Sequence, residues 1–420
     1  MDCTGDRGAV RFGAVLVLVL LVTCAVYLIL VSQFGIETEV VRDRYWKNVY
    51  PLFHGEVPAM EYPPFAIVFM AIPGIFADQP WTYNVAYVVE MLVFVVIGMC
   101  LVARAAGNLG RDKKKAMLVY TILILLMFEF VVDRYDIVPM VFVLGAFVLF
   151  SERRYELAFL LLALGTLAKL YPIIVFPLFV MYLIGRGCTR DAVRGTAVFV
   201  LTGAVVMAVF WLIDPEMATS FLGYHTDRPL QLESVAASVL YPLSLTGLFD
   251  ARIQLFVDNS FGSDNLIGPV PDAVAGILLP LMLLSIVLFY IVFAVRHMRA
   301  PETDLHVLNL SIMVVLLLFM LVNKVFSAQY LIWIIPSVAM LHVFGPGGGF
   351  AKKVTCLTIL TLLLTQLLFA FNAGYCGGDI GTAGMMLILI RNVVACSILY
   401  IVFRESMCSG ECGACAEPEV

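Results

Sequence analysis

The sequence predicts an all-α polytopic membrane protein, a bundle of about twelve transmembrane helices with both termini in the cytosol. Of its 420 residues, 62% are hydrophobic and only 14% are charged, whereas about half and about a quarter are typical of soluble proteins. The mean hydropathy of +0.99 indicates the same class. The apolar stretches are continuous rather than alternating, which excludes an outer-membrane barrel.

The expected spans follow one another along the chain with short connections. They are Gly13–Ser32, Trp81–Arg104, Ala116–Val132, Ile137–Phe150, Leu157–Ala168, Ile173–Gly185, Thr196–Ile213, Asp272–Val295, Leu305–Val322, Tyr330–Phe344, Thr355–Phe371 and Met385–Phe403. The first is too long for a signal peptide and lacks an Ala-x-Ala site, so we expect it to be retained.

The basic residues support this order. If the short apolar segment Pro64–Ala77 lies at the interface instead of crossing, every dense basic cluster falls on one side, as the positive-inside rule requires. These clusters are Lys113–Lys115, Arg153–Arg154, Arg186–Arg194, Arg296–Arg299 and Lys352–Lys353.

The predicted organisation is one membrane domain over residues 1–404 and a flexible, cysteine-containing cytosolic tail over 405–420. An exterior loop at 33–80 holds an interfacial helix at 64–77, and a larger exterior loop covers 214–271. The larger loop contains a second apolar piece, Val235–Phe249, that is also expected to be interfacial. Loops of this length are usually functional or disordered, and these are too aromatic for disorder.

Composition excludes several other functions. The net charge of −5 argues against nucleic acid as a partner. A Gly-x-x-x-x-Gly-Lys phosphate loop is missing from the sequence, so ATP-driven transport has no support. The ten cysteines do not form a disulfide framework, because several lie in apolar runs. Cys408, Cys412 and Cys415 lack the fourth ligand that metal sites usually need.

The charges that the cytosolic rule does not explain all lie at the predicted exterior face. They include the cations Arg134, Lys169, Arg228 and Lys324. Any one of them can simply face water, but positive charge is normally scarce on that side. Four cations together favour an anionic ligand, and phosphate suits both Arg and Lys. A nearby carboxylate such as Asp43 is a candidate general base.

A series of short motifs then resembles one known family, over nearly the whole chain. Asp43 is followed by Gly55–Pro58, Glu61–Pro64, Arg134–Pro139, Ala168–Pro172, Tyr224–Ser234 and Lys324–Trp333. In this order they resemble the polyprenyl-phosphate-dependent membrane glycosyltransferases of the GT-C superfamily, most closely the mannosyltransferase-like family 87. The segment between Pro58 and Glu61 is shorter than is usual in the family.

The resemblance implies inverting transfer of a hexose, expected to be mannose, from a polyprenyl-phosphate donor to a lipid or glycan acceptor. This would take place at the extracytoplasmic face of the cell membrane, within surrounding membrane lipids. Asp43 would be the catalytic base. The donor phosphate and substrate would be held by Arg134, Asp136, Lys169, Tyr171, His225, Arg228, Glu233, Lys324, Gln329 and Tyr330. Acceptor-side or supporting roles fall to Glu61, Gln231 and Arg391.

Two alternative functions stay open at this point. Twelve spans also suit a carrier or flippase for an anionic lipid-linked sugar, and the buried Arg391 fits that reading best. A ligase for a whole lipid-linked glycan is also compatible with large exterior loops. No metal cofactor is required, although Asp133, Asp136 and Glu233 are the residues that would hold Mg²⁺.

Overall fold

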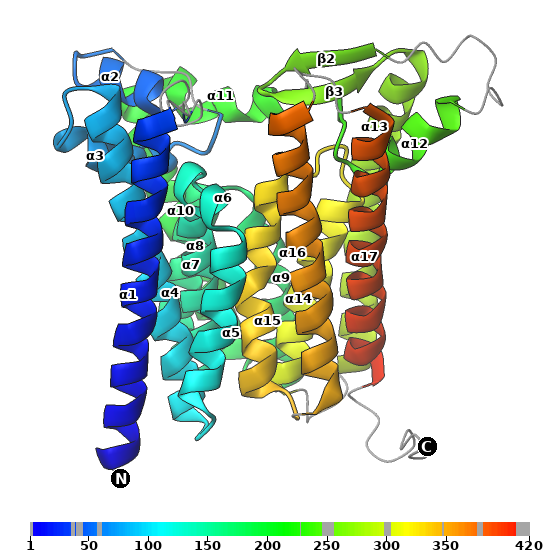
Figure 1. Ribbon diagram of the computed structural model, residues 1–420. Coiled ribbons are helices and arrows are strands. Elements are labelled where there is room, and N and C mark those ends of the chain that lie inside the picture. Colours follow the sequence, from blue (N-terminus) through cyan, green and yellow to red (C-terminus); the bar gives the residue numbers. More distant parts are fainter. Residues whose placement is uncertain are drawn as a thin grey trace. The chain divides into compact units, whose positions relative to one another are not determined.

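The computed structural model describes residues 3–34, 38, 45–56, 61–226, 228–245, 256–297, 304–346, 348–375 and 381–408. The chain folds into two compact units. The first consists of Met1–Ile173, Gly195–Arg228 and Ser327–Val343, and the second of Ile174–Arg194, Pro229–Phe326 and Phe344–Val420. Both units are built mainly of helices (Figure 1). The prediction of an all-α polytopic protein is therefore confirmed.

The first unit contains most of the N-terminal half of the chain. Its elements are α1 (Cys3–Phe34), α2 (Lys47–Leu52), α3 (Ala66–Ile75), α4 (Pro80–Asn108), α5 (Lys113–Leu126), α6 (Phe128–Asp133), α7 (Ile137–Ser151), α8 (Tyr155–Ala168), the larger part of α10 (Thr189–Ile213), α11 (Pro215–Thr226), the 3-10 helix η3 (Ala328–Ile334) and α15 (Ile335–Phe344) up to Val343. The 3-10 helix η2 (Tyr171–Ile174) begins in this unit.

The second unit combines long helices with a small sheet. Its elements are α9 (Phe176–Gly185), β1 (Leu230–Gln231), α12 (Val235–Leu245), β2 (Phe256–Ser260), β3 (Ser263–Ile267), α13 (Pro269–His297), α14 (Leu305–Leu321), α16 (Gly349–Tyr375) and α17 (Gly381–Cys408). The strands form an antiparallel sheet in the order β1-β3-β2, with Leu230 opposite Leu266 and Val257 opposite Leu266 on the other side. This sheet lies within the predicted loop 214–271 and was not expected from the sequence.

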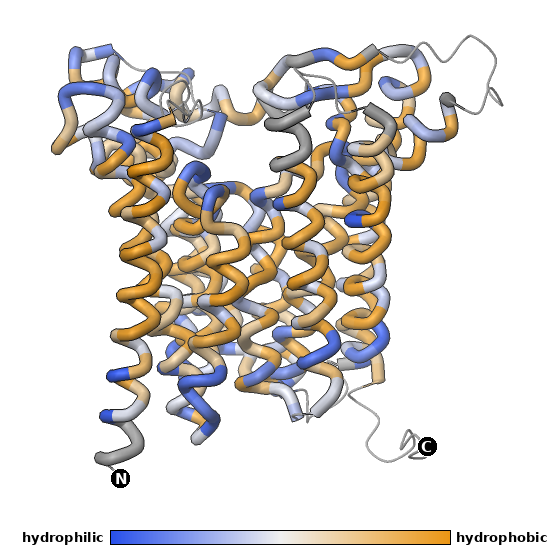
Figure 2. Tube along the Cα trace, viewed as in Figure 1, coloured by the Kyte–Doolittle hydropathy of each residue, from blue (hydrophilic) through white to orange (hydrophobic). Residues whose placement is uncertain are grey.

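The helices have the dimensions and composition of membrane spans. Within the described ranges, six helices are long and apolar enough to cross a bilayer, and several shorter apolar helices accompany them. Figure 2 shows hydrophobic residues along the helices and polar residues toward their ends. The protein is therefore a multi-pass membrane protein, while the count of twelve spans stays a prediction.

Local sequence explains where several helices begin. Pro80 opens α4 next to Gln79, whose side chain forms a reciprocal capping box with Thr82. Asp112 accepts hydrogen bonds from the backbone N–H groups of Lys114 and Lys115 at the start of α5. Such caps satisfy backbone donors that would otherwise lack partners at a helix end.

Three boundaries differ from the expectation. The predicted span Ala116–Val132 is broken at Met127, where φ −117° and ψ 18° leave helical geometry between α5 and α6. The last helix, α17, continues to Cys408, so the predicted tail from residue 405 is wrong for its first four residues. The interfacial segment predicted at 64–77 is helical only over Ala66–Ile75.

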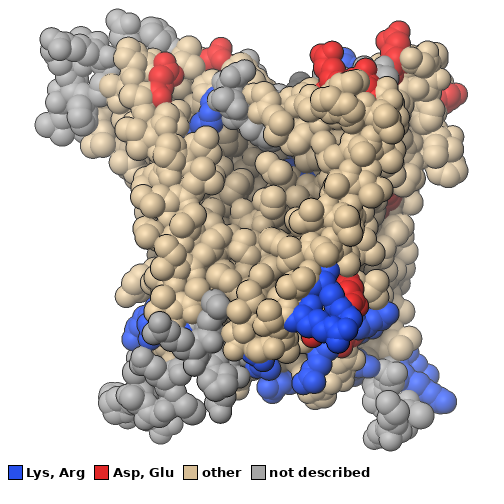
Figure 3. Space-filling model, turned by 180° about the vertical axis from the view of Figure 1, so that it is seen from behind, with Lys and Arg blue, Asp and Glu red and all other residues tan. Residues whose placement is uncertain are grey.

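Figure 3 shows a group of Lys and Arg side chains, with Asp and Glu beside them, on the face that it draws. In the first unit, basic residues follow α4 and α7, with Arg111 in the turn after α4, Lys113–Lys115 at the start of α5, and Arg153 and Arg154 in the turn after α7. Two of those turns are tight, with positive φ at Gly110 and Arg153. Short basic turns of this kind are typical of the cytosolic side.

Candidate functional site

A buried ion pair lies at one end of the hairpin formed by α7 and α8. Lys169 Nζ is 2.8 Å from Asp136 Oδ1, and the two residues are 9% and 1% exposed. Asp136 stands just before the first turn of α7, and Lys169 just after the last turn of α8. Because the helices are consecutive and antiparallel, these two positions meet. Each charge also complements the adjacent helix dipole.

Aromatic rings surround this ion pair. Lys169 Nζ is 5.0 Å from the ring centre of Tyr62 and 5.7 Å from the rings of Tyr330 and Trp333. Trp333 also donates a hydrogen bond of 2.6 Å from its indole N–H to Asp136 Oδ1. Its ring stacks against Tyr171 at 3.9 Å and against Tyr330 at 4.2 Å. Cation–π attraction therefore stabilises the ammonium group in addition to the carboxylate.

Further charges approach the same cluster. The Tyr45 hydroxyl interacts electrostatically with Arg134, Glu61 and Asp136, and Tyr330 interacts with Arg228, Asp136 and Glu61. The Nε of Arg134 is buried and has no hydrogen-bond partner among the described residues. The first unit thus gathers seven of the predicted site residues. They are Glu61, Arg134, Asp136, Lys169, Tyr171, Arg228 and Tyr330.

The tyrosines of the N-terminal loop contribute neutral hydroxyls to this cluster. Burial raises the pKa of the Tyr45 and Tyr62 hydroxyls, so both keep their protons at neutral pH. Tyr45 Oη accepts a hydrogen bond of 3.2 Å from the backbone N–H of Tyr135. The cluster is therefore an apolar, aromatic environment with a few convergent polar groups, which is typical of small-molecule sites.

Three predicted residues cannot be placed with this cluster. Asp43 lies outside the described residues, and His225 belongs to α11 but its side chain is not described. Gln329 is half-buried within η3. Their predicted roles stay predictions.

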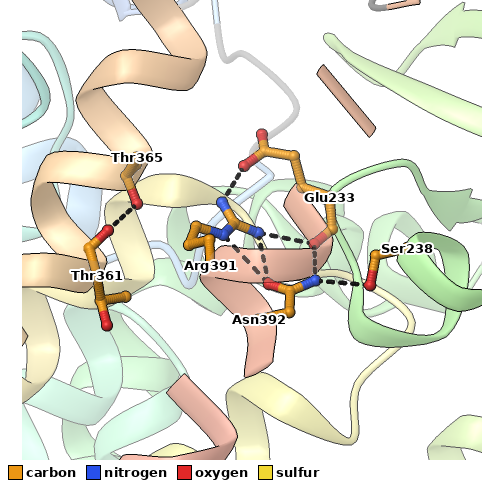
Figure 4. Close-up of polar contacts among 6 residues, drawn as sticks. All are labelled: Glu233, Ser238, Thr361, Thr365, Arg391 and Asn392. Atoms are coloured by element: carbon orange, nitrogen blue, oxygen red, sulfur yellow. Dashed lines mark hydrogen bonds and ion pairs between the residues drawn. The ribbon is translucent and has the colours of Figure 1, made fainter. Parts of the chain in front are cut away.

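The other predicted residues belong to the second unit, where Arg391 and Glu233 form a separate network (Figure 4). Arg391 is 0% exposed. Its Nη1 donates to Glu233 Oε2 at 2.7 Å, and its Nη2 donates to the Glu233 backbone carbonyl at 2.8 Å. Its Nε donates to Asn392 Oδ1 at 3.1 Å. Asn392 in turn donates to Ser238 Oγ at 3.0 Å.

This network joins α17 to the start of α12. The Arg391 guanidinium lies 4.7 Å from the centre of the Phe326 ring, so the guanidinium makes a cation–π contact in addition to its hydrogen bonds. Every guanidinium nitrogen already donates to a protein acceptor. Arg391 therefore acts as an anchor between helices, and the Glu233 carboxylate is occupied by it.

Gln231 and Lys324 lie in the same unit, at the edge of the sheet. The backbone N–H of Gln231 donates to the carbonyl of Lys324 at 3.0 Å. Gln231 is buried, at 3% exposure, and Lys324 is half-buried. Asn392 and Ser238 were missed by the sequence reasoning, because a lone amide or hydroxyl in an apolar run carries no distinctive pattern.

The sequence reasoning also missed Tyr87 and Glu90 on α4. A carboxylate within a candidate span is costly and is a functional signal by itself. The spacing Tyr83, Tyr87, Glu90 on one helix face was visible in the sequence. Among the residues that the structure describes, no group of three metal-ligating side chains lies together.

The fold and this cluster define a class, a multi-pass membrane protein with a buried, cationic and aromatic site. The family model of glycosyltransferase family 87 matches residues 61–323, and the chain belongs to this family. It is therefore a membrane glycosyltransferase, which confirms the resemblance and favours an enzyme over a carrier. A search among curated proteins finds no match.

Proposed function

We propose that this glycosyltransferase moves a hexose, mannose, from a polyprenyl-phosphate donor to a hydroxyl of a lipid or glycan acceptor with inversion. The observation that supports the proposal most is the cluster of Lys169, Arg134 and Arg228 around stacked aromatic rings in the first unit. A polyprenyl chain is insoluble, so an enzyme that uses it must meet it within the membrane.

The cations are proposed to hold the donor phosphate. Lys169 uses one of its three N–H groups on Asp136, which leaves two for a ligand oxygen. Arg134 offers a buried Nε without a partner in the described part of the chain. Phosphate is the leaving group, and fixed cations stabilise the negative charge that grows on it as the bond breaks.

The chemical step is proposed as a single displacement. Asp43 removes the proton from the acceptor hydroxyl while the acceptor oxygen attacks the anomeric carbon. The bond between that carbon and the phosphate oxygen breaks, and the electron pair leaves with polyprenyl phosphate. The role of Asp43 rests on the family resemblance. No metal is needed in this scheme, so activity should persist in a chelator.

The site is proposed to face away from the cytosol at the cell membrane. The support is that the basic turns of the first unit, after α4 and α7, are at the opposite end of the α7–α8 hairpin from Asp136 and Lys169.

The experiment incubates purified protein with an acceptor lipid and a panel of labelled donors, including polyprenyl-phosphate mannose, polyprenyl-phosphate glucose and GDP-mannose. Transfer from the polyprenyl donors alone is expected, and Asp43→Asn should reduce it by about two to four orders of magnitude. Transfer from the nucleotide sugar would contradict the proposed donor. Full activity of Asp43→Asn would remove that residue as the base.

A further inference from the structure

One face of α4 carries buried polar groups that the mechanism above does not use. Tyr83, Tyr87 and Glu90 are spaced four and three residues apart, so they point to the same side of the helix. Tyr83 is satisfied, since its hydroxyl donates to the Met70 carbonyl at 2.9 Å. The Tyr87 hydroxyl and both Glu90 carboxylate oxygens are buried and have no hydrogen-bond partner within the described residues.

Tyr135 adds a third group from the turn between α6 and α7. Its hydroxyl is likewise buried and unpartnered in the described part of the structure. Glu90 lies within electrostatic range of both Tyr87 and Tyr135. The Tyr45 ring is 5.3 Å from Tyr87, and the Tyr45 hydroxyl accepts from the Tyr135 backbone. The three side chains therefore converge from two elements of the first unit.

This group is adjacent to the cationic cluster. The centre of the Tyr62 ring is 5.9 Å from that of the Tyr135 ring and 5.0 Å from Lys169 Nζ. The Tyr62 ring thus contacts both the Tyr135 ring and the ammonium group that is proposed to hold phosphate.

Leaving such groups unpaired is costly. A buried polar group without a partner destabilises a protein by about 1–3 kcal/mol, and more if it is charged. Native proteins rarely keep several of them together without a function. A carboxylate and two phenols offer mainly acceptors and rotating hydroxyl donors. They suit a ligand with many hydroxyl groups, whereas polar groups disfavour an alkyl chain.

We propose that Tyr87, Glu90 and Tyr135 bind the hydroxyl groups of a sugar ring, next to the cations that bind the donor phosphate. Neighbouring aromatic faces, such as Tyr45, would cover the apolar face of the ring. The inference rests on the proposed function, because it assigns the sugar to a defined part of the same site.

The test compares the binding of polyprenyl-phosphate mannose and of sugar-free polyprenyl phosphate to purified protein. Glu90→Gln and Tyr87→Phe should each bind the mannosyl donor about tenfold or more weakly, with sugar-free binding unchanged. Tyr87→Phe should not lower the melting temperature, because the removed hydroxyl has no hydrogen-bond partner among the residues that the structure describes.

Two control variants separate binding from structure. Tyr120→Phe removes another buried hydroxyl, on α5, that has no hydrogen-bond partner in the described ranges, and it should alter neither donor affinity nor stability. Tyr83→Phe loses the bond to Met70 and should lower the melting temperature while keeping the preference for the sugar.

The proposal is overturned if Tyr87→Phe and Glu90→Gln weaken both ligands equally, or if they destabilise the protein as Tyr83→Phe does. If the wild type binds no sugar-free polyprenyl phosphate, the proposed donor fails. The sugar site is then tested by the binding of octyl mannoside. This binding should be weakened by Glu90→Gln and by Tyr87→Phe, and unchanged binding in both variants would refute the sugar site. A selective effect on octyl mannoside alone supports the sugar site and assigns it to the acceptor.

Discussion

Lys169 and Asp136 depend on each other more than on any other described partner. A buried ion pair adds little net stability over an apolar pair, but removing one partner leaves an uncompensated charge. In this protein the stranded group would be Asp136, which is 1% exposed and, among the described residues, keeps only the hydrogen bond from Trp333 at Oδ1.

We therefore expect Lys169→Met to lower the free energy of unfolding by about 3–5 kcal/mol. The double variant Lys169→Met/Asp136→Asn should recover much of this loss, because a neutral amide is cheaper to bury. Thermal unfolding in detergent measures both. Equal stability of the wild type and Lys169→Met would show that the pair is exposed to water.

Arg391 illustrates a different outcome for a predicted site residue. Each of its three nitrogens donates to Glu233 or Asn392, so its contribution is expected in stability and not in donor binding. Arg391→Met should destabilise the protein by about 3–5 kcal/mol, and Arg391→Met/Glu233→Gln by less. Donor affinity of the folded fraction should be unchanged. Normal stability with a selective loss of donor affinity would refute the anchoring role.

Another salt bridge, between Arg104 and Glu152, joins the end of α4 to the residue after α7. Arg104 donates from Nε to Glu152 Oε1 at 2.6 Å, and Asn108 donates to the same oxygen at 2.7 Å. The hydrogen bond from Arg104 lowers the pKa of Glu152. A carboxyl group whose pKa is lowered by folding stabilises the folded protein at pH values above its ordinary pKa. This stabilisation is lost as the pH falls through the lowered pKa.

Glu152→Gln should therefore be less stable than the wild type at neutral pH by no more than about 1 kcal/mol, since the Arg104 side chain is 48% exposed. The difference should shrink below about pH 4.3, the ordinary carboxyl pKa. Melting temperatures of both proteins across this range measure it. A difference that stays constant with pH would contradict the assigned cause.

The elements show which features hydropathy predicts. Apolar runs and basic turns predicted the α7–α8 hairpin, and hence that Asp136 and Lys169 lie at one end of it. The helix break at Met127 was not predictable from hydropathy, because Met127 is as apolar as its neighbours Leu126 and Phe128. The sheet was not predicted, because a strand of two residues such as β1 leaves no pattern in the sequence. The partner of Arg391 was not predicted either, because Glu233 lies 158 positions away in the chain.

For the molecule as a whole, sidedness follows from the distribution of basic residues. In a cysteine-free background, Lys114→Cys and Lys352→Cys should react with an impermeant thiol reagent only from the cytosol, since both lysines are exposed in basic segments at the start of a helix, α5 and α16. Glu56→Cys, an exposed position after α2, should react only from outside. The opposite pattern would invert the proposed orientation of the site.

The most direct measurement concerns the donor phosphate. Binding of polyprenyl phosphate is compared between the wild type, Arg134→Gln, Arg228→Gln and the control Lys114→Gln, which removes an exposed cation from the start of α5. The first two should weaken binding by about ten- to a hundredfold, and the control should leave it unchanged. Unchanged affinity in both arginine variants would contradict a phosphate site in the first unit.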